Sequence, residues 1–146
     1  MQVNDPFKDD PTRKFNNFGG VDPSTLKNVP SAFGFSIELY GNHNFSNVKM
    51  DTYDAFKTRM TGYLKQNLPI VVCWNPTGGH YETVIGYDSM GTDDPYDDVI
   101  VLADSADSKD HYVDGYNTFP AMQFYSRFFN GGWGLAQMLL VIKPNK

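Results

Sequence analysis

Three short apolar segments separated by turns constrain the fold of this chain more than any other feature. They cover residues 70–74, 80–87 and 99–103, and each has the length and the β-branched or aromatic content of a strand. The turn at 75–79 contains proline and a glycine pair, and the turn at 91–98 is acidic. Strands joined by connections this short pair antiparallel. The sequence therefore predicts an antiparallel sheet in the middle of the chain.

Helical and strand patterns flank this predicted sheet. Apolar residues three or four positions apart indicate helices, and alternating ones indicate strands. Helices are expected at 22–29 (ending before Pro30), at 51–67, and from a Thr118 cap to a glycine stop at 131–132; strands are expected at 33–39 and 135–142. Together these elements predict an α+β fold in which helices pack on a mainly antiparallel sheet.

The length of 146 residues suits one compact domain, which we place at residues 21–146 after an irregular lead-in at 1–20. The net charge is −5, and no cluster of Lys or Arg is present. Nucleic acids and anionic membrane surfaces are bound through basic patches, so neither is an expected partner. No apolar run approaches the roughly 18–20 residues that a membrane span requires.

The first residues of the sequence carry no export signal, because no basic region followed by an apolar stretch is present. Two interpretations of the localisation remain open. The protein is cytoplasmic, or Met1 replaces a longer natural start and the protein is secreted or bound at the cell surface. The chain has one cysteine, so an internal disulfide is impossible and the compartment stays undetermined.

One histidine and one aspartate are candidates for acid–base chemistry. His80 opens the segment 80–87, and Asp104 follows directly on 99–103. In an antiparallel pair the start of one strand lies beside the end of the next, and a carboxylate there fixes the tautomer and orientation of an imidazole. A surface histidine near an unrelated aspartate fits the same spacing. Alternation along the strand places His80, Glu82, Val84 and Gly86 on one face and Tyr81, Thr83, Ile85 and Tyr87 on the other.

The segments around these two residues resemble a known family. A Leu-Pro-Ile-Val-Val strand, a Gly-His followed by Val-Ile-Gly-Tyr, and a strand ending in Asp-Ser lie within residues 64–105. This order is similar to the His–Asp half of papain-like cysteine peptidases, in the bacterial bacteriocin-processing (double-glycine) peptidase-like branch, over roughly residues 20–142. The resemblance implies a papain-like fold and a thiol protease or amidase that acts on a peptide or protein without a cofactor. His80 would be the general base and then the general acid, and Asp104 would orient it.

The nucleophile that this family requires is missing from its expected place. The family carries its cysteine at the start of a helix that precedes the sheet, whereas the first cysteine of this chain is Cys73, inside an apolar strand. A buried strand cysteine is typically structural. Three explanations remain open: the thiol lies on a second chain produced by processing, the thiol lies in a preceding segment, or the chain is a non-catalytic module that binds a peptide or partner. A toxin or effector fragment is a further possibility that no sequence feature tests.

Other residues suggest a substrate cleft or a metal site less specifically. Gly79, Trp74, Tyr81 and Trp133 are candidates for a cleft beside His80, although aromatic residues in so aromatic a chain also suit the core. The acidic turn at 93–98 and the series Asp104, Asp107 and Asp110 offer oxygens to Ca²⁺, but a solvated loop explains them as well. His43 and His111 lack partners at ligand spacing. We therefore predict no metal site and no cofactor.

Overall fold

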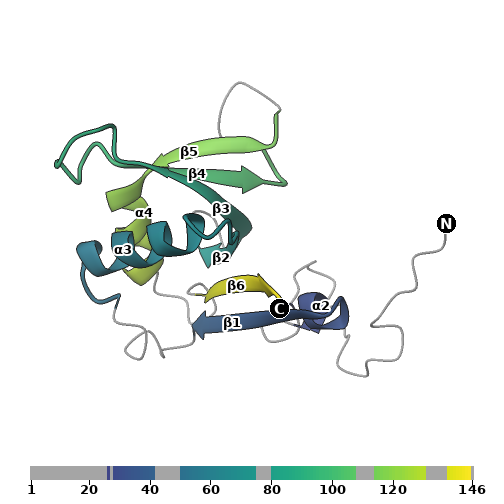
Figure 1. The fold of residues 1–146 in the computed structure, drawn as a ribbon. Helices are drawn as coiled ribbons and strands as arrows, with labels where there is room; N and C mark the ends of the chain where they lie inside the picture. Colours follow the sequence, from purple (N-terminus) through teal and green to yellow (C-terminus); the bar gives the residue numbers. More distant parts are fainter. Residues whose placement is uncertain are drawn as a thin grey trace.

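A six-stranded antiparallel sheet forms the centre of the protein in this computed structural model, which describes residues 26, 28–41, 50–74, 80–107, 114–130 and 138–145. The strand order is β1-β6-β2-β3-β4-β5, and the sheet is strongly twisted (Figure 1). The strands are β1 (Phe35–Gly41), β2 (Ile70–Trp74), β3 (His80–Asp88), β4 (Val99–Asp104), β5 (Tyr116–Pro120) and β6 (Met138–Pro144). The predicted antiparallel sheet and the α+β class are confirmed.

Two consecutive hairpins, β2–β3 and β3–β4, hold the segments that the sequence placed at the centre. Trp74 lies opposite His80 in the first hairpin, and Glu82 lies opposite Asp104 in the second. The last strand, β6, pairs with β1 on one side and with β2 on the other, so it joins β1 to the rest of the sheet. This register brings the start of β3 and the end of β4 to the same region of the sheet.

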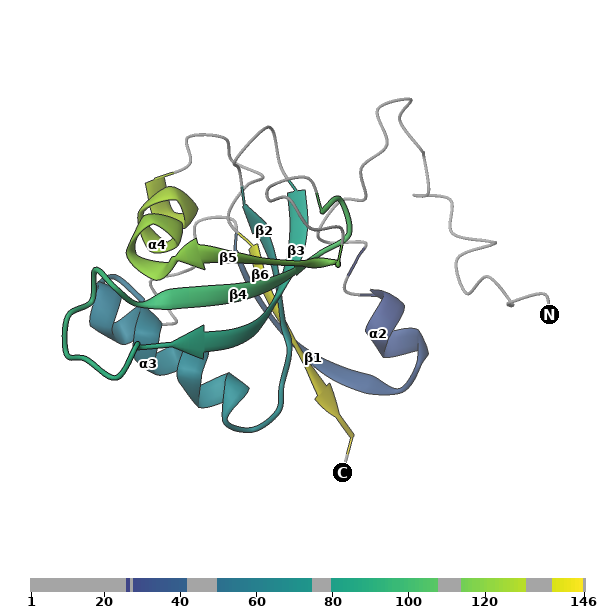
Figure 2. The ribbon, with the colours of Figure 1, turned by 90° about the horizontal axis from the view of Figure 1, so that it is seen from above.

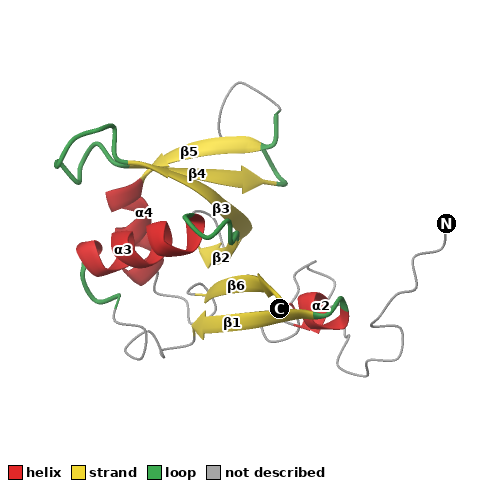
Figure 3. Ribbon diagram, viewed as in Figure 1, coloured by secondary structure: helices red, strands yellow, loops and turns green. Residues whose placement is uncertain are grey.

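Two helices, α3 (Tyr53–Leu64) and α4 (Ala121–Asn130), cover one face of the sheet (Figures 2 and 3). The cap of α3 is Thr52, whose hydroxyl accepts a hydrogen bond from the backbone N–H of Ala55 at 3.2 Å. Buried aromatic residues from both helices pack on apolar side chains of β2, β3, β4 and β6. None of the described helices has the length and apolar character needed to cross a membrane.

A smaller apolar cluster lies on the opposite face of the sheet. It contains Cys73, Met138 and Leu140, with Leu26, Ile37, Val71, Tyr81 and Ile142 packed around them. The short helix α2 (Asn28–Ala32) lies beside β1. The predicted end of this helix before Pro30 is wrong, since Pro30 is buried within α2.

The predicted helix start at Thr118 is also wrong. Residues 116–120 form β5, which pairs with β4, and α4 begins only at Ala121. The backbone N–H of Ala121 donates to the carbonyl of Asp98 at 2.8 Å. Tyr, Thr and Phe in this stretch favour a strand, and pairing with an otherwise open edge decides the outcome. The irregular lead-in expected at 1–20 lies outside the described residues.

A bulge in β3 changes which side chains share a face. The register with β4 shifts between Val84 and Gly86, and this extra residue reverses the alternation that follows it. Tyr87 therefore joins Val84 on the face covered by α3, whereas the sequence placed Tyr87 on the other face. Gly86 is suited to the position beyond the bulge, because a Cβ there would lie only 3.1 Å from the Cβ of Val101.

Candidate active site

His80 and Asp104 are in direct contact at the end of the β3–β4 hairpin. Nε2 of His80 lies 2.5 Å from Oδ1 of Asp104. The Asp104 side chain is fully buried, whereas 28% of the His80 side chain is exposed. A buried carboxylate thus holds an imidazole that solvent can reach. This arrangement is the one expected from pairing the start of one strand with the end of the next.

Further hydrogen bonds fix the Asp104 carboxylate in place. Oδ1 also accepts from the backbone N–H of Ala106 at 2.9 Å, and Oδ2 accepts from Nδ2 of Asn117 at 3.2 Å. Burial alone would raise the pKa of Asp104, but the hydrogen bonds from His80 and Ala106 outweigh it and hold this pKa well below its ordinary value. Asp104 is therefore ionised throughout the physiological range.

A second buried carboxylate, Glu82, lies beside this pair. It faces Asp104 across the β3–β4 ladder and is 2% exposed. Its oxygens accept hydrogen bonds from the indole N–H of Trp74 and from Nδ2 of Asn117, the latter at 3.3 Å. Asn117, on β5, thus donates to both carboxylates. His80, Glu82 and Asp104 each place one potential metal-ligand atom within 4.8 Å of the other two. Among the described residues this is the only such cluster of His, Cys, Asp or Glu side chains.

Sequence reasoning did not identify Glu82 or Asn117 as site residues. The sequence does contain one indication for Glu82, because a residue two positions after His80 lies on the same face of the strand, and a charged side chain there can join the site. The sequence contains no such indication for Asn117, which directly precedes the predicted helix start at Thr118. Its position depends on the pairing of β5 with β4, which places Asn117 opposite Leu102.

Cys73 is separated from His80 by the sheet. It lies in the cluster on the opposite face, 5% exposed, and adjacent residues of a strand point to opposite faces. Burial raises the pKa of its thiol, and a hydrogen bond with Tyr81 offsets only part of that rise. The thiol is therefore neutral and cannot reach the imidazole, as its place in an apolar strand suggested.

Of the residues suggested for a substrate cleft, the structure describes Trp74 and Tyr81. Trp74 is fully buried in the core, with its ring centroid 4.6 Å from that of Phe124 and 5.1 Å from that of Phe119. Tyr81 is half-buried on the face that carries Cys73. Gly79 and Trp133 lie outside the described residues, as do His43, Asp110 and His111. Trp74 thus contributes to the site through the hydrogen bond that its indole N–H donates to Glu82.

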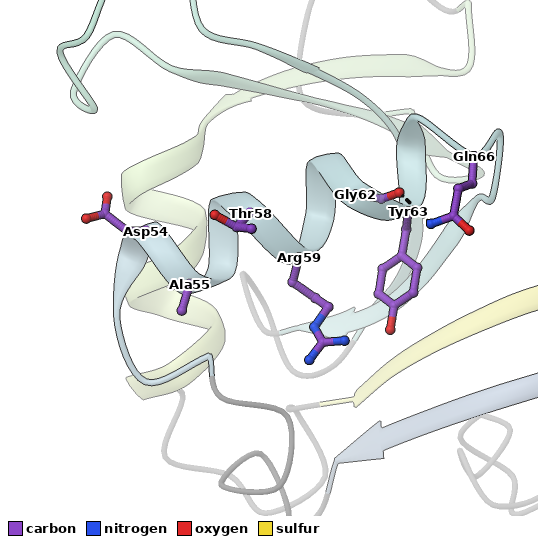
Figure 4. A pocket seen from close by; sticks show the side chains of 7 residues that line it. All are labelled: Asp54, Ala55, Thr58, Arg59, Gly62, Tyr63 and Gln66. Atoms are coloured by element: carbon purple, nitrogen blue, oxygen red, sulfur yellow. Dashed lines mark hydrogen bonds between the residues drawn. The ribbon is translucent and has the colours of Figure 1, made fainter.

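Two cavities among the described residues lie away from the imidazole. One, of about 500 Å³, follows α3, and Figure 4 shows Arg59 and Tyr63 projecting into it on the side toward β1 and β6. The other, of about 490 Å³, is mainly apolar and lies among α2, the α3–β2 turn and the ends of β1 and β6. Neither is lined by His80 or Asp104.

The acidic segment after β3 is organised by its own side chains. The Thr92 hydroxyl donates a hydrogen bond that both oxygens of Asp97 share, at 2.9 and 2.8 Å. Asp98 is 1% exposed, so the interpretation of 93–98 as a solvated turn is wrong at its last residue. Asp107 accepts from the backbone N–H of Gly115 at 2.7 Å and closes the β4–β5 connection.

The lowered pKa of Asp104 predicts a pH-dependent contribution to stability. A carboxyl whose folded pKa lies below its unfolded value near 3.8 stabilises the fold above that value, and this contribution is lost as the pH falls toward the folded pKa. We expect Asp104→Asn to lower the free energy of unfolding by about 2 kcal/mol at pH 7, since hydrogen bonds to a charged group are lost. Urea titrations at pH 7, 5 and 3 should show this difference shrinking below pH 4. The exposed Asp93→Asn is the control, and a difference that grows as the pH falls would contradict the assignment.

Comparisons with protein-family models, with curated proteins and with solved structures find no match to this chain. The geometry of the site is therefore the basis for any functional assignment.

Proposed function

We propose that this chain is the His–Asp half of a papain-like cysteine peptidase or amidase. The single observation that carries the proposal is the 2.5 Å contact between Nε2 of His80 and Oδ1 of Asp104, with the carboxylate buried and the imidazole accessible. In nucleophile–His–Asp sites the carboxylate orients the imidazole, and the imidazole exchanges the proton of the nucleophile. The order of strands around the two residues, and their resemblance to that family, support the same assignment.

The contact with Asp104 determines which ring nitrogen performs the chemistry. Because Nε2 donates to the carboxylate, Nδ1 is the nitrogen left to accept a proton, and it has no hydrogen-bond partner among the described residues. His80 takes the proton of a thiol through Nδ1 and later returns it to the leaving amine. Asp104 stays ionised during this cycle and stabilises the imidazolium that forms.

The attacking thiolate comes from a segment or chain other than residues 1–146. Cys73 is the sole cysteine here, and it is buried on the opposite face of the sheet. A thiolate at the start of a helix, placed beside Nδ1, would attack the amide carbonyl of a peptide or protein substrate. By this proposal the chain alone lacks activity and gains it only when the thiol is supplied.

Thiol labelling of the product of the complete reading frame tests this proposal. An iodoacetamide probe should label one cysteine outside residues 1–146 at neutral pH, and His80→Ala should slow that labelling at least about tenfold because the thiolate loses its imidazole partner. Cys73→Ser should leave the labelling unchanged. Peptide mapping by mass spectrometry identifies the labelled residue.

Three results would refute the assignment. These are the absence of a reactive cysteine outside this chain, labelling that does not respond to His80→Ala in a folded variant, or labelling of Cys73 itself. Retention of biological activity by His80→Ala would instead identify a non-catalytic module that binds a peptide or partner on the same fold.

A further inference from the structure

The cluster around Asp104 has the composition of a transition-metal site. A ring nitrogen of His80 and one oxygen each from Glu82 and Asp104 lie within 4.8 Å of one another. Tetrahedral Zn²⁺ with bonds of about 2.0–2.2 Å separates its ligands by roughly 3.3–3.6 Å. The longest of these separations therefore has to shorten by about 1.2–1.5 Å, and the 2.5 Å contact between His80 and Asp104 has to lengthen by about 1 Å, shifts that side-chain rotation provides. Neutral imidazole and two carboxylates carry a formal charge of −2, which matches a divalent ion.

Asn117 supplies a second, independent indication. It is 4% exposed, and its Nδ2 donates to an oxygen of Glu82 and an oxygen of Asp104. Its Oδ1 is buried and has no hydrogen-bond partner among the described residues. Buried amide oxygens are normally paired. Rotation of this amide group would turn Oδ1 toward the two carboxylates, and a cation bound between them would stabilise that arrangement.

We propose that His80, Glu82 and Asp104, with Asn117 as an oxygen donor, form a site for Zn²⁺ or a similar transition-metal ion. The imidazole distinguishes this site from one for Mg²⁺ or Ca²⁺, which take oxygen ligands. His and carboxylate side chains are usual zinc ligands, and the Asn117 oxygen would complete a tetrahedral set of four. The indole N–H of Trp74 donates a hydrogen bond to Glu82 and would orient this ligand toward the ion without binding the ion itself.

Occupancy of this site would inhibit the activity proposed above. A metal ion bound by His80 removes the imidazole from proton exchange and competes with its hydrogen bond to Asp104. This inhibitory role rests on the proposed function, whereas the binding of the ion does not. The two are therefore tested separately.

Calorimetric titration of chelator-treated protein, residues 1–146, with Zn²⁺ at pH 7 tests the site. We expect one ion per chain and an affinity at least about tenfold lower in Glu82→Gln, because loss of even an outer partner of a metal ligand costs about that much and Glu82 is a charged ligand. His80→Gln is a second test variant. Because the His80 side chain is partly exposed, this substitution should disturb the fold less than Glu82→Gln does. Circular dichroism establishes that each variant is folded.

The controls separate this site from other zinc-binding groups of the chain. Cys73→Ser and the double variant His43→Gln/His111→Gln should bind zinc as the parent does. X-ray absorption should show nitrogen and oxygen ligands at about 2.0–2.2 Å and no sulfur near about 2.3 Å. The absence of binding, binding unaffected by Glu82→Gln and His80→Gln, or loss of binding in a control variant would each overturn the proposal. Since no activity is measured, none of these results bears on the proposed peptidase function.

Discussion

Asp98→Ala is expected to lower the free energy of unfolding by about 3–5 kcal/mol, because it removes the acceptor of a buried charged network. The Asp98 carboxylate accepts from Lys57 Nζ at 2.9 and 3.1 Å and from the hydroxyls of Tyr53 and Tyr87 at 2.7 and 2.6 Å. Burial would raise the pKa of Asp98, yet these hydrogen bonds lower it below its ordinary value. Burial, together with the bonds to this carboxylate, raises the pKa values of both tyrosines. Alanine would remove the acceptor shared by three donors and leave the two tyrosines only their hydrogen bond to each other, at 2.6 Å.

The same network joins α3 and α4 to β3, the strand that carries His80 and Glu82. Tyr53 and Lys57 belong to α3, Tyr87 to β3, and the carbonyl of Asp98 accepts the first N–H of α4. Urea denaturation at pH 7 measures the loss, and exposed Asp93→Ala should change stability by less than about 0.5 kcal/mol. A double-mutant cycle with Lys57→Met separates the ion pair from the tyrosine bonds. A loss below about 1 kcal/mol in Asp98→Ala would show that the network contributes little.

The central hairpins were predictable because their signals are local. The segments 70–74, 80–87 and 99–103 are apolar runs of strand length, and the polar turns between them leave antiparallel pairing as the natural outcome. Antiparallel pairing places the start of β3 beside the end of β4. The contact between His80 and Asp104 follows because the two residues lie at these two strand ends. The helix at Tyr53–Leu64 was equally clear, since its apolar residues recur at helical spacing.

The surroundings of the pair depend on contacts distant in sequence, and they were not predictable. Asn117 reaches the two carboxylates only because β5 adds to the edge of β4. Tyr87 changes face because of one extra residue in β3, which alternation cannot reveal. Asp98 has the sequence context of a solvated turn, and its burial results from donors on α3 and β3. In each case tertiary pairing decided against the local pattern.

Phe124→Ala is expected to lower the free energy of unfolding by about 3–5 kcal/mol, the usual cost of removing a buried aromatic ring. Phe124 is fully buried in α4, and its ring lies 4.6 Å from the ring of Trp74, 5.6 Å from Phe128 and 6.0 Å from Phe56, measured between centroids. These rings hold both helices against the sheet, so the cavity left by alanine cannot be filled by a small local shift. Urea denaturation provides the measurement, and Phe33→Ala, at a position that is 63% exposed, provides the control.

The effect of Phe124→Ala should extend from the core to the candidate site through Trp74. The indole that packs on Phe124 donates its N–H to Glu82, and Glu82 shares the amide of Asn117 with Asp104. A looser Trp74 should therefore exchange its indole hydrogen with solvent faster, which NMR can follow with Trp133→Phe as the background that leaves one tryptophan signal. Unchanged exchange in a destabilised variant would mean that the hydrogen bonds of Glu82 hold Trp74 without help from the core. Faster exchange would mean that aromatic packing between α4 and β2 is what keeps the two carboxylates and the imidazole in register.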